Sequence, residues 1–363
     1  MKHYLLILTA ALVAFNASAQ KTEKLTASKG NDYGLVYTLP KTAVDITVET
    51  ETTVKKRGEF ANYARMRLGI NDALTEPSTR VTVKSITIGT RGVPDGENRW
   101  IAQFKPGSNV SILLDEGGIP LAINADAVDE AEPQELPEAV PMPVSPLDKP
   151  VARQVLTQEM IRSTSLSKKA ELAAQRIYEL REQRNELISG NVDNMPADGA
   201  SLKVALDALA EQEEALTAMF AGTSLTGTQV NTFSFVPSSG EVTDSIVARI
   251  SPVDGLTDSD DLRGIPMTVS IKVISRGELP VNEKGETKKF PKGGVAYNIP
   301  GAAEITVSYN GKVLGSKTVD LAQFGATFGI DPDLFTHKKS PMQATFSPVT
   351  GTLLSLEPIN AAE

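Results

Sequence analysis

Histidine and cysteine, the residues that most often carry catalysis or bind metals, are nearly missing from this 363-residue chain, which has two histidines and no cysteine. His3 lies in the apolar N-terminal segment, and His337 stands before two lysines. This composition excludes cysteine nucleophiles and histidine-rich zinc sites. A serine triad would need His337, yet no nucleophile-elbow motif is present. We expect His337 to be a solvated surface residue and assign no catalytic residue.

Acidic side chains offer another route to chemistry. Residues 254–261 read DGLTDSDD, and their oxygens, from Asp254 to Asp261, are of the kind that calcium binds. The segment lacks the EF-hand spacing and its terminal glutamate, so an Asp-rich turn is the preferred interpretation over a calcium site. A glycoside hydrolase would need two carboxylates about 5 to 10 Å apart, and the sequence selects no pair. No Gly-rich phosphate loop is present, and we predict no metal and no cofactor.

Aromatic platforms would indicate carbohydrate binding, and Trp100 is the only tryptophan of the sequence. Strand alternation places Trp100 on one face with Ala102 and Phe104, which favours core packing. A glycan-binding surface would require an exposed Trp100, or joint exposure of several of the tyrosines Tyr33, Tyr37, Tyr63, Tyr297 and Tyr309.

The N-terminal segment predicts export. Residues 1–19 contain Lys2, an apolar run and a final Ala17-Ser18-Ala19, which together are typical of a cleavable signal peptide. The apolar run is too short to span a membrane. Because the chain has no cysteine, no lipid can be attached to a cysteine side chain. We therefore expect a periplasmic or extracellular protein that is not inserted in a membrane. A net charge of −9 argues against nucleic acid as a partner.

Residues 151–221 are the longest helical stretch, with apolar residues at alternating spacings of four and three. Gly190 and Asp198 suit a helix C-cap and N-cap, so two helices fold back as an antiparallel coiled-coil hairpin. Arg184 and Glu213 interrupt the two apolar seams, and we expect each to lie at the rim, unpaired. We expect the seam to bury mainly itself and not the sheets; its residues include Leu166, Ile177, Leu180, Leu206, Leu209 and Leu216.

Short alternating segments on both sides of this stretch predict antiparallel strands. Asn310-Gly311 is a strong hairpin signal, and residues 58–68 predict one short helix. The predicted fold is mainly β with a helical insert, in which two antiparallel β-sheet or sandwich domains accompany the helical hairpin. The expected divisions are a signal peptide at 1–19, an N-terminal β domain at 20–125, a Pro- and acid-rich solvated linker at 126–150, the hairpin at 151–221 and a C-terminal β domain at 222–363.

The two β-rich halves resemble each other locally. Residues 34–40 (GLVYTLP) and 294–300 (GVAYNIP) are each followed by an alternating segment, DITV at 45–48 and EITV at 304–307. Two Arg-Gly motifs, at 91–94 and 276–280, also correspond, but in swapped order. Both common descent of the halves and similar hairpin chemistry explain this pattern.

Several motifs together resemble a known family. They are Gly34-x-x-Tyr37-x-Leu39-Pro40-Lys41-Thr42, Gly58-Glu59-Phe60-x-x-Tyr63-Ala64 ending Leu68-Gly69, Arg91-Gly92-Val93-Pro94-Asp95, Ser251-Pro252 with Asp261-Leu262-x-Gly264-x-Pro266, and Ala322-Gln323-Phe324-Gly325. The set is similar to a family of secreted Bacteroidetes proteins catalogued as domain of unknown function 4831. The resemblance implies an exported protein of a Gram-negative bacterium and assigns no catalytic residue.

Three functional hypotheses follow from the sequence. The preferred one is an exported structural or interaction protein of unknown specific role that acts through binding surfaces, with a protein or a glycan as its partner. The alternatives are a glycan-binding module and a carboxylate-based glycoside hydrolase. The scarcity of histidine, the absence of cysteine and the thin helical seam favour the first hypothesis.

Overall fold

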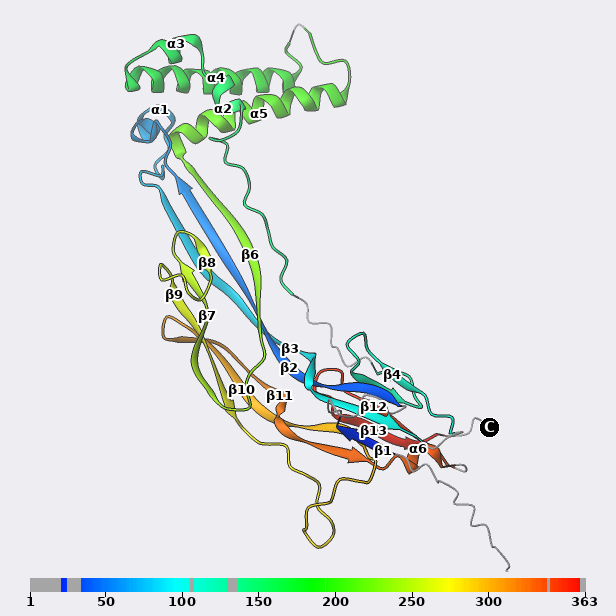
Figure 1. The fold of residues 1–363 in the computed structure, drawn as a ribbon. Helices are drawn as coiled ribbons and strands as arrows, with labels where there is room; N and C mark the ends of the chain where they lie inside the picture. The colour runs from blue at the N-terminus through cyan, green and yellow to red at the C-terminus, as the bar shows by residue number, and fades with distance from the viewer. Residues whose placement is uncertain are drawn as a thin grey trace, which may run out of the picture.

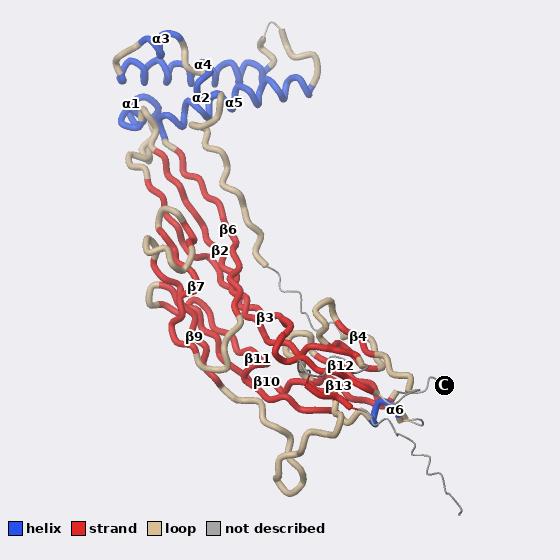
Figure 2. Tube along the Cα trace, viewed as in Figure 1, coloured by secondary structure: helices blue, strands red, loops and turns tan. Residues whose placement is uncertain are grey.

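The computed structural model describes residues 21–24, 34–104, 108–128, 136–192, 194–337 and 340–359. Their fold is mainly antiparallel β-sheet with a helical insert, as predicted (Figure 1, Figure 2). The expected signal peptide at 1–19 and Tyr33 lie outside the described residues. No described helix is both long and apolar enough to cross a bilayer.

The strands of the described residues form three sheets. In spatial order, the first contains β1 (Lys21–Lys24), β3 (Ser78–Gln103), β2 (Leu35–Lys56) and β6 (Thr223–Phe235). The second contains β11 (Lys312–Ile330), β10 (Val295–Tyr309), β9 (Ile265–Val273), β7 (Val242–Ser251) and β8 (Gly255–Thr257). The third contains β13 (Leu353–Pro358), β12 (Met342–Phe346), β5 (Pro120–Ile123) and β4 (Ile112–Leu114).

Strands from before and after the helical insert share sheets. β6 pairs with β2 from Val44↔Phe235 to Lys56↔Thr223, and β12 pairs with β5 through Ala344↔Ile123. Divisions at residues 125 and 222 therefore do not separate two β domains. Alternation and turn residues report which segments are strands and which neighbours they meet through short turns. They carry no information on partners that lie more than a hundred residues away.

β2 is the strand that connects the whole molecule. Its 22 residues span about 70 Å at a rise of about 3.3 Å per residue. Tyr37 and Leu39, near its beginning, are buried in one hydrophobic core, here called the lower core. Ile46, near its middle, is buried in a second hydrophobic core, here called the middle core. Phe60, just beyond its end, is buried in a third core made with helices.

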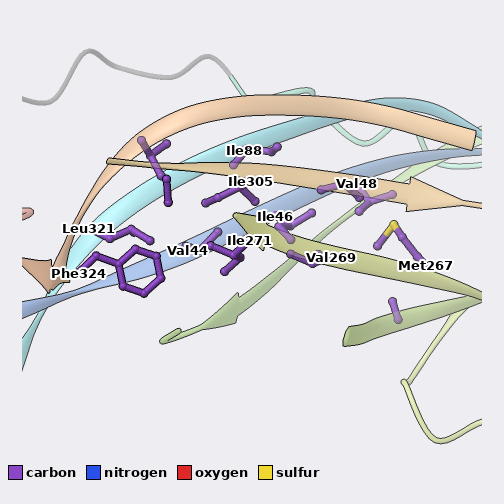
Figure 3. Packing of buried hydrophobic residues seen from close by; sticks show 14 residues of the cluster. Val44, Ile46, Val48, Ile88, Met267, Val269, Ile271, Ile305, Leu321 and Phe324 are labelled. Atoms are coloured by element: carbon purple, nitrogen blue, oxygen red, sulfur yellow. The ribbon is translucent and has the colours of Figure 1, made fainter. Parts of the chain in front are cut away.

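The middle core lies between the first two sheets (Figure 3). β2 contributes Val44, Ile46 and Val48, which alternate along the strand and therefore share one face. Ile271 and Ile305, from the second sheet, pack against them and are at most 1% exposed. Burial of these aliphatic side chains holds the two sheets face to face.

The two similar motifs of the sequence meet in the lower core. The Ala296 amide donates to the Tyr37 hydroxyl at 2.8 Å, and the Asn298 side chain donates to the Pro40 carbonyl at 3.0 Å. Burial raises the pKa of Tyr37 well above its usual value. Both strands also shift register beside their proline, between Thr38 and Pro40 in β2 and on either side of Pro300 in β10. The two motifs are thus alike in structure as well as in sequence. Common descent of the two halves stays a hypothesis.

A close backbone approach lies near this crossing. A side-chain carbon at Gly92 would stand 1.9 Å from the Pro348 carbonyl oxygen, so only glycine fits there without movement. Gly96, four residues further along β3, has nothing within 4 Å of the same position. The Arg-Gly motif of β3 therefore marks a contact between distant segments.

Residues 136–150, here called the strap, run along β6 toward the helices (Figure 1). The Thr228 amide donates to the Val140 carbonyl at 2.8 Å, and Ser145 is 2% exposed and hydrogen-bonded to Thr223 at 3.2 Å. The expected linker is extended here, but it is not fully solvated, because β6 offers it backbone and hydroxyl partners. Gly227 gives the strap room to cross the sheet.

The helices gather at one end of the long strands, in a unit here called the head (Figure 1). The head contains η1 (Ala61–Tyr63), α1 (Ala64–Leu68), α2 (Val151–Gln154), α3 (Gln158–Arg162), α4 (Leu166–Ser189) and α5 (Gly199–Ala221). The short α6 (Asp333–Thr336) lies at the opposite end of the molecule, beside β12 and β13.

Candidate functional site

The antiparallel pair α4 and α5 forms where the sequence predicted two helices, and its ends have the predicted caps. Gly190 ends α4 with a left-handed φ of 74°, and the Asp198 carboxylate begins α5 by accepting from the Ser201 amide at 2.7 Å. This hydrogen bond lowers the pKa of Asp198. The caps fix the two helix ends on either side of the connecting loop.

The half of the pair nearest the strands buries its seam against the rest of the head. Ile177, Leu180 and Leu216 are at most 1% exposed, and their cluster includes Phe60 and Met160 but no strand residue among its described members. The seam therefore avoids the sheets, as expected. It packs on the other head helices as well as on itself, because α1, α2 and α3 bring further apolar side chains over it.

The other half of the pair, residues 181–214, is here called the distal arm. Among its described residues none is buried. Ile188 and Val204 are 66% and 68% exposed. Between the two helices lies a hollow of about 390 Å³, lined by Gln183, Glu186, Leu187, Val192, Ala205, Ala208 and Leu209. A hollow lined mostly by apolar side chains, on a segment that also exposes Ile188 and Val204, favours a contact surface.

A larger groove, here called the elbow groove, lies where the strap, the helical pair and the first residues of β6 meet. It has a volume of about 860 Å³. Its apolar wall includes Pro143, Val144, Ala218 and Leu225. Its charged lining residues are Lys149, Arg181, Arg184, Glu213 and Glu214.

An ion cluster forms the charged side of the elbow groove. Arg181 Nε and Arg184 Nη1 each donate to one oxygen of Glu213, both at 2.6 Å. The Arg181 guanidinium also lies over the Tyr178 ring, 5.7 Å from its centre, and the Tyr178 hydroxyl donates to the Arg67 carbonyl of α1 at 3.1 Å. The expectation that Arg184 and Glu213 stay unpaired is therefore wrong. The antiparallel register brings the two seam interruptions to the same level.

The Asp-rich segment forms a turn whose carboxylates meet a cation of the chain. Arg263 binds Asp261 at 2.6 Å and Asp254 at 3.2 Å. The Arg263 side chain lowers the pKa of Asp261 to about 2, the opposite of what a general acid requires. Within the described ranges, no group of three or more His, Cys, Asp or Glu side chains is placed to hold a metal.

The predicted aromatic candidates do not form an open platform. Trp100 is partly buried against the lower core, and its ring stacks on Phe290 at 5.6 Å with 9° between the planes. Among the named tyrosines, Tyr37 is buried in the lower core, Tyr63 packs in the head and Tyr309 packs on the middle core. Tyr297 lies partly buried near Trp100, 6.4 Å from the Phe328 ring.

His337 is exposed at the end of α6, as its place between Thr336 and two lysines indicates. Sequence reasoning missed Arg181 and the whole elbow groove. The groove is lined by residues of the strap, the helices and β6, so no single sequence motif predicts it. The one available signal was the pair of charged residues at seam positions, which pattern analysis placed at the rim.

Comparisons with known proteins give one family. The model of the family described as "Domain of unknown function (DUF4831)" matches residues 33–354. No curated protein and no solved structure matches the chain.

Proposed function

We propose that this chain, which belongs to that family of unknown function, is an exported structural or interaction protein that acts through binding surfaces and not through catalysis. Export, into the periplasm or beyond and without a lipid anchor, rests on the signal-peptide pattern of residues 1–19. The binding end in this proposal is the head, and the partner is a protein or a glycan.

The distal arm carries the proposal. Its helices project sideways from the end of the long strands (Figure 1), and none of its described residues is buried. A helical pair normally covers its apolar seam, because each buried Leu, Ile or Val side chain contributes about 1.5–3 kcal/mol. Here the seam residues Leu187, Leu206 and Leu209 are only partly buried. Ile188 and Val204, which lie outside the seam, are largely exposed. An arm of this kind gains stability from a partner that covers it.

Two features of the described residues weigh against the alternatives. The Phe290 ring covers one face of Trp100, which removes the open platform that a glycan-binding module needs. Asp261, in a hollow of about 470 Å³ with two other aspartates, has a lowered pKa and is held by Arg263, which does not suit a hydrolase acid.

Photo-crosslinking in the native cell tests this function. A photoreactive side chain at Val204 or Ile188, both on the distal arm, should give a discrete crosslinked product. The control is Val313, which is 64% exposed and lies on β11 near the Asn310-Gly311 turn; it should give none. No product at either arm position, or the same products from all three positions, would overturn the proposal. Cell fractionation and N-terminal sequencing that begins at Gln20 test the export.

A further inference from the structure

We propose that the elbow groove binds a carboxylate carried on an apolar body, and that Arg181 and Arg184 are the residues that bind the carboxylate. The inference deepens the proposed function, because it rests on the head being the binding end and adds a ligand class to it. The elbow groove includes the inner end of the distal arm but neither Ile188 nor Val204, the two crosslinking positions, so the two proposals can fail independently.

The first argument is the charge of the ion cluster. Two guanidinium groups share the single Glu213 carboxylate, so the cluster carries one positive charge that Glu213 does not compensate. Lys149, on the same groove, already has two partners of its own, Glu211 at 3.5 Å and Glu214 at 3.6 Å. Of these two carboxylates only Glu214 lines the groove, so the charged lining residues are three cations and two carboxylates, with a sum of one positive charge. In a chain with a net charge of −9, a positively charged lining favours an anion.

The second argument is the free bonding capacity of the two arginines. A guanidinium has five N–H donors. Within the described part of the chain, Arg181 and Arg184 each make one hydrogen bond, in both cases to Glu213. Their side chains are 40% and 35% exposed, so the remaining donors are open to solvent and to a ligand. A guanidinium with free donors can bind a carboxylate through two parallel hydrogen bonds.

The third argument is that the arginines are already held in place. Glu213, whose side chain is 14% exposed, fixes both guanidinium groups, and the Tyr178 ring supports Arg181. Tyr178 is in turn held by α1 through the Arg67 carbonyl. A ligand that meets side chains ordered in advance loses less conformational entropy on binding.

The fourth argument concerns the rest of the ligand. The apolar part of the lining comes from three separate segments, with Pro143 and Val144 from the strap, Ala218 from α5 and Leu225 from β6. A volume of about 860 Å³ lies within the usual range of about 300–1,000 Å³ for ligand sites. The groove therefore suits an apolar body with one carboxylate at its end.

A purely structural role explains the cluster less well. The neighbouring seam positions hold Leu180, Leu187, Leu209 and Leu216. Apolar residues at the interruptions would join the helices at least as well, since a partly exposed ion pair contributes only about 0–1 kcal/mol. Keeping charges at this level exposes guanidinium donors at the groove, which a leucine pair would not do.

Two sources share this chemistry, a fatty acid and the free C-terminus of an apolar peptide. Calorimetric titration of the purified mature chain should compare decanoate with its neutral amide, and the peptide N-acetyl-LVAL with its C-terminal amide. We expect at least one carboxylate to bind, and its amide to bind at least tenfold more weakly. If decanoate alone binds, the source is a lipid; if the peptide alone binds, the source is a protein terminus.

Variants then test the residues. Arg184→Gln should weaken carboxylate binding at least tenfold, and Val144→Glu, at a 66% exposed position of the wall, should also weaken it by charge repulsion. The matched control is Arg176→Gln, which removes a cation from α4 that pairs with Glu179 and does not line the groove. An unchanged helical signal shows that the variants fold.

Three results would overturn the inference. They are no binding of either carboxylate at about 10 mM, equal binding of acid and amide, or equal binding by wild type, Arg184→Gln and Val144→Glu. Failure here, with crosslinks still formed at Val204, would leave the proposed function of the arm standing. Success here with no crosslink at Val204 would instead place the binding end in the elbow groove alone.

Discussion

Two leucine truncations on α5 measure the difference between the covered half of the helical pair and the distal arm. Leu216 is 0% exposed and belongs to the core of the head, while Leu206 is only partly buried, ten residues nearer the tip. Both positions are on the predicted seam. If the isolated chain has the arrangement described here, Leu216→Ala creates a cavity and Leu206→Ala mainly shortens a solvated side chain.

The expected magnitudes are well separated. A buried Leu→Ala change costs about 2–5 kcal/mol, because the transfer term and the cavity term add. We expect this loss for Leu216→Ala, and less than about 1 kcal/mol for Leu206→Ala, since solvent already reaches that side chain. Most of the described helix lies in the head, so the loss should be seen in the helical signal while the β signal keeps its own transition.

Urea denaturation followed by far-ultraviolet circular dichroism checks this, with hydrogen exchange to locate the affected amides. Exchange should accelerate in α4, α5 and the helices that cover them in Leu216→Ala, and only near the loop tip in Leu206→Ala. A loss for Leu206→Ala equal to that for Leu216→Ala would refute the reasoning. It would mean that the distal seam is covered in the isolated protein, for instance by self-association.

The remaining predictions concern the β part. Gly92→Ala should lower the melting temperature by several degrees, whereas Gly96→Ala, without a neighbour at that position, should leave it within about 2 °C; equal melting would contradict the close approach. The carboxylate of Asp261 has a pKa lowered to about 2 from an ordinary 3.8, so its stabilising effect is present above about pH 4 and is lost as pH falls toward 2; the stability difference between wild type and Asp261→Asn should shrink over that window, and a constant difference would argue against the ion pair. Phe290→Ala should speed trypsin cleavage within residues 276–294, because the stack on the tryptophan ring is lost, whereas Leu279→Ala, at a 39% exposed position, should not; unchanged cleavage in both would show that the stack does not hold the loop.

Much of the local structure could be read from the sequence. Heptad spacing located the helical pair, and Gly190 and Asp198 marked its inner ends, because caps are decided by hydrogen bonds within a few residues. Alternation identified the segment around Ile46 as β, although it predicted short strands and the structure has one strand of 22 residues there. Asn310-Gly311 formed the predicted hairpin, with Asn310 and Gly311 at φ 49° and 73°. In each case the signal and its consequence lie within one element.

The domain boundaries and the candidate site could not be predicted from the sequence. The sequence placed residues 126–150 in solvent and 222–363 in a separate domain, but the strap lies on β6 and β6 lies on β2. Likewise it treated Arg184 and Glu213 as unrelated interruptions, although the fold joins them through 2.6 Å contacts. Periodicity states which face of an element is apolar, and not which distant element covers that face.

The sequence by itself therefore determined the helical pair with its caps, the Asn310-Gly311 turn, the β character of the flanking segments and the scarcity of catalytic side chains. Only the tertiary structure decided that two arginines share one glutamate beside an apolar wall at the elbow of the molecule. The physical reason is the distance along the chain over which each interaction acts. Helix and turn preferences act over a few residues, whereas the elbow groove depends on chain segments that are brought together by strand pairing and by burial of the cores, to which every part of the chain contributes.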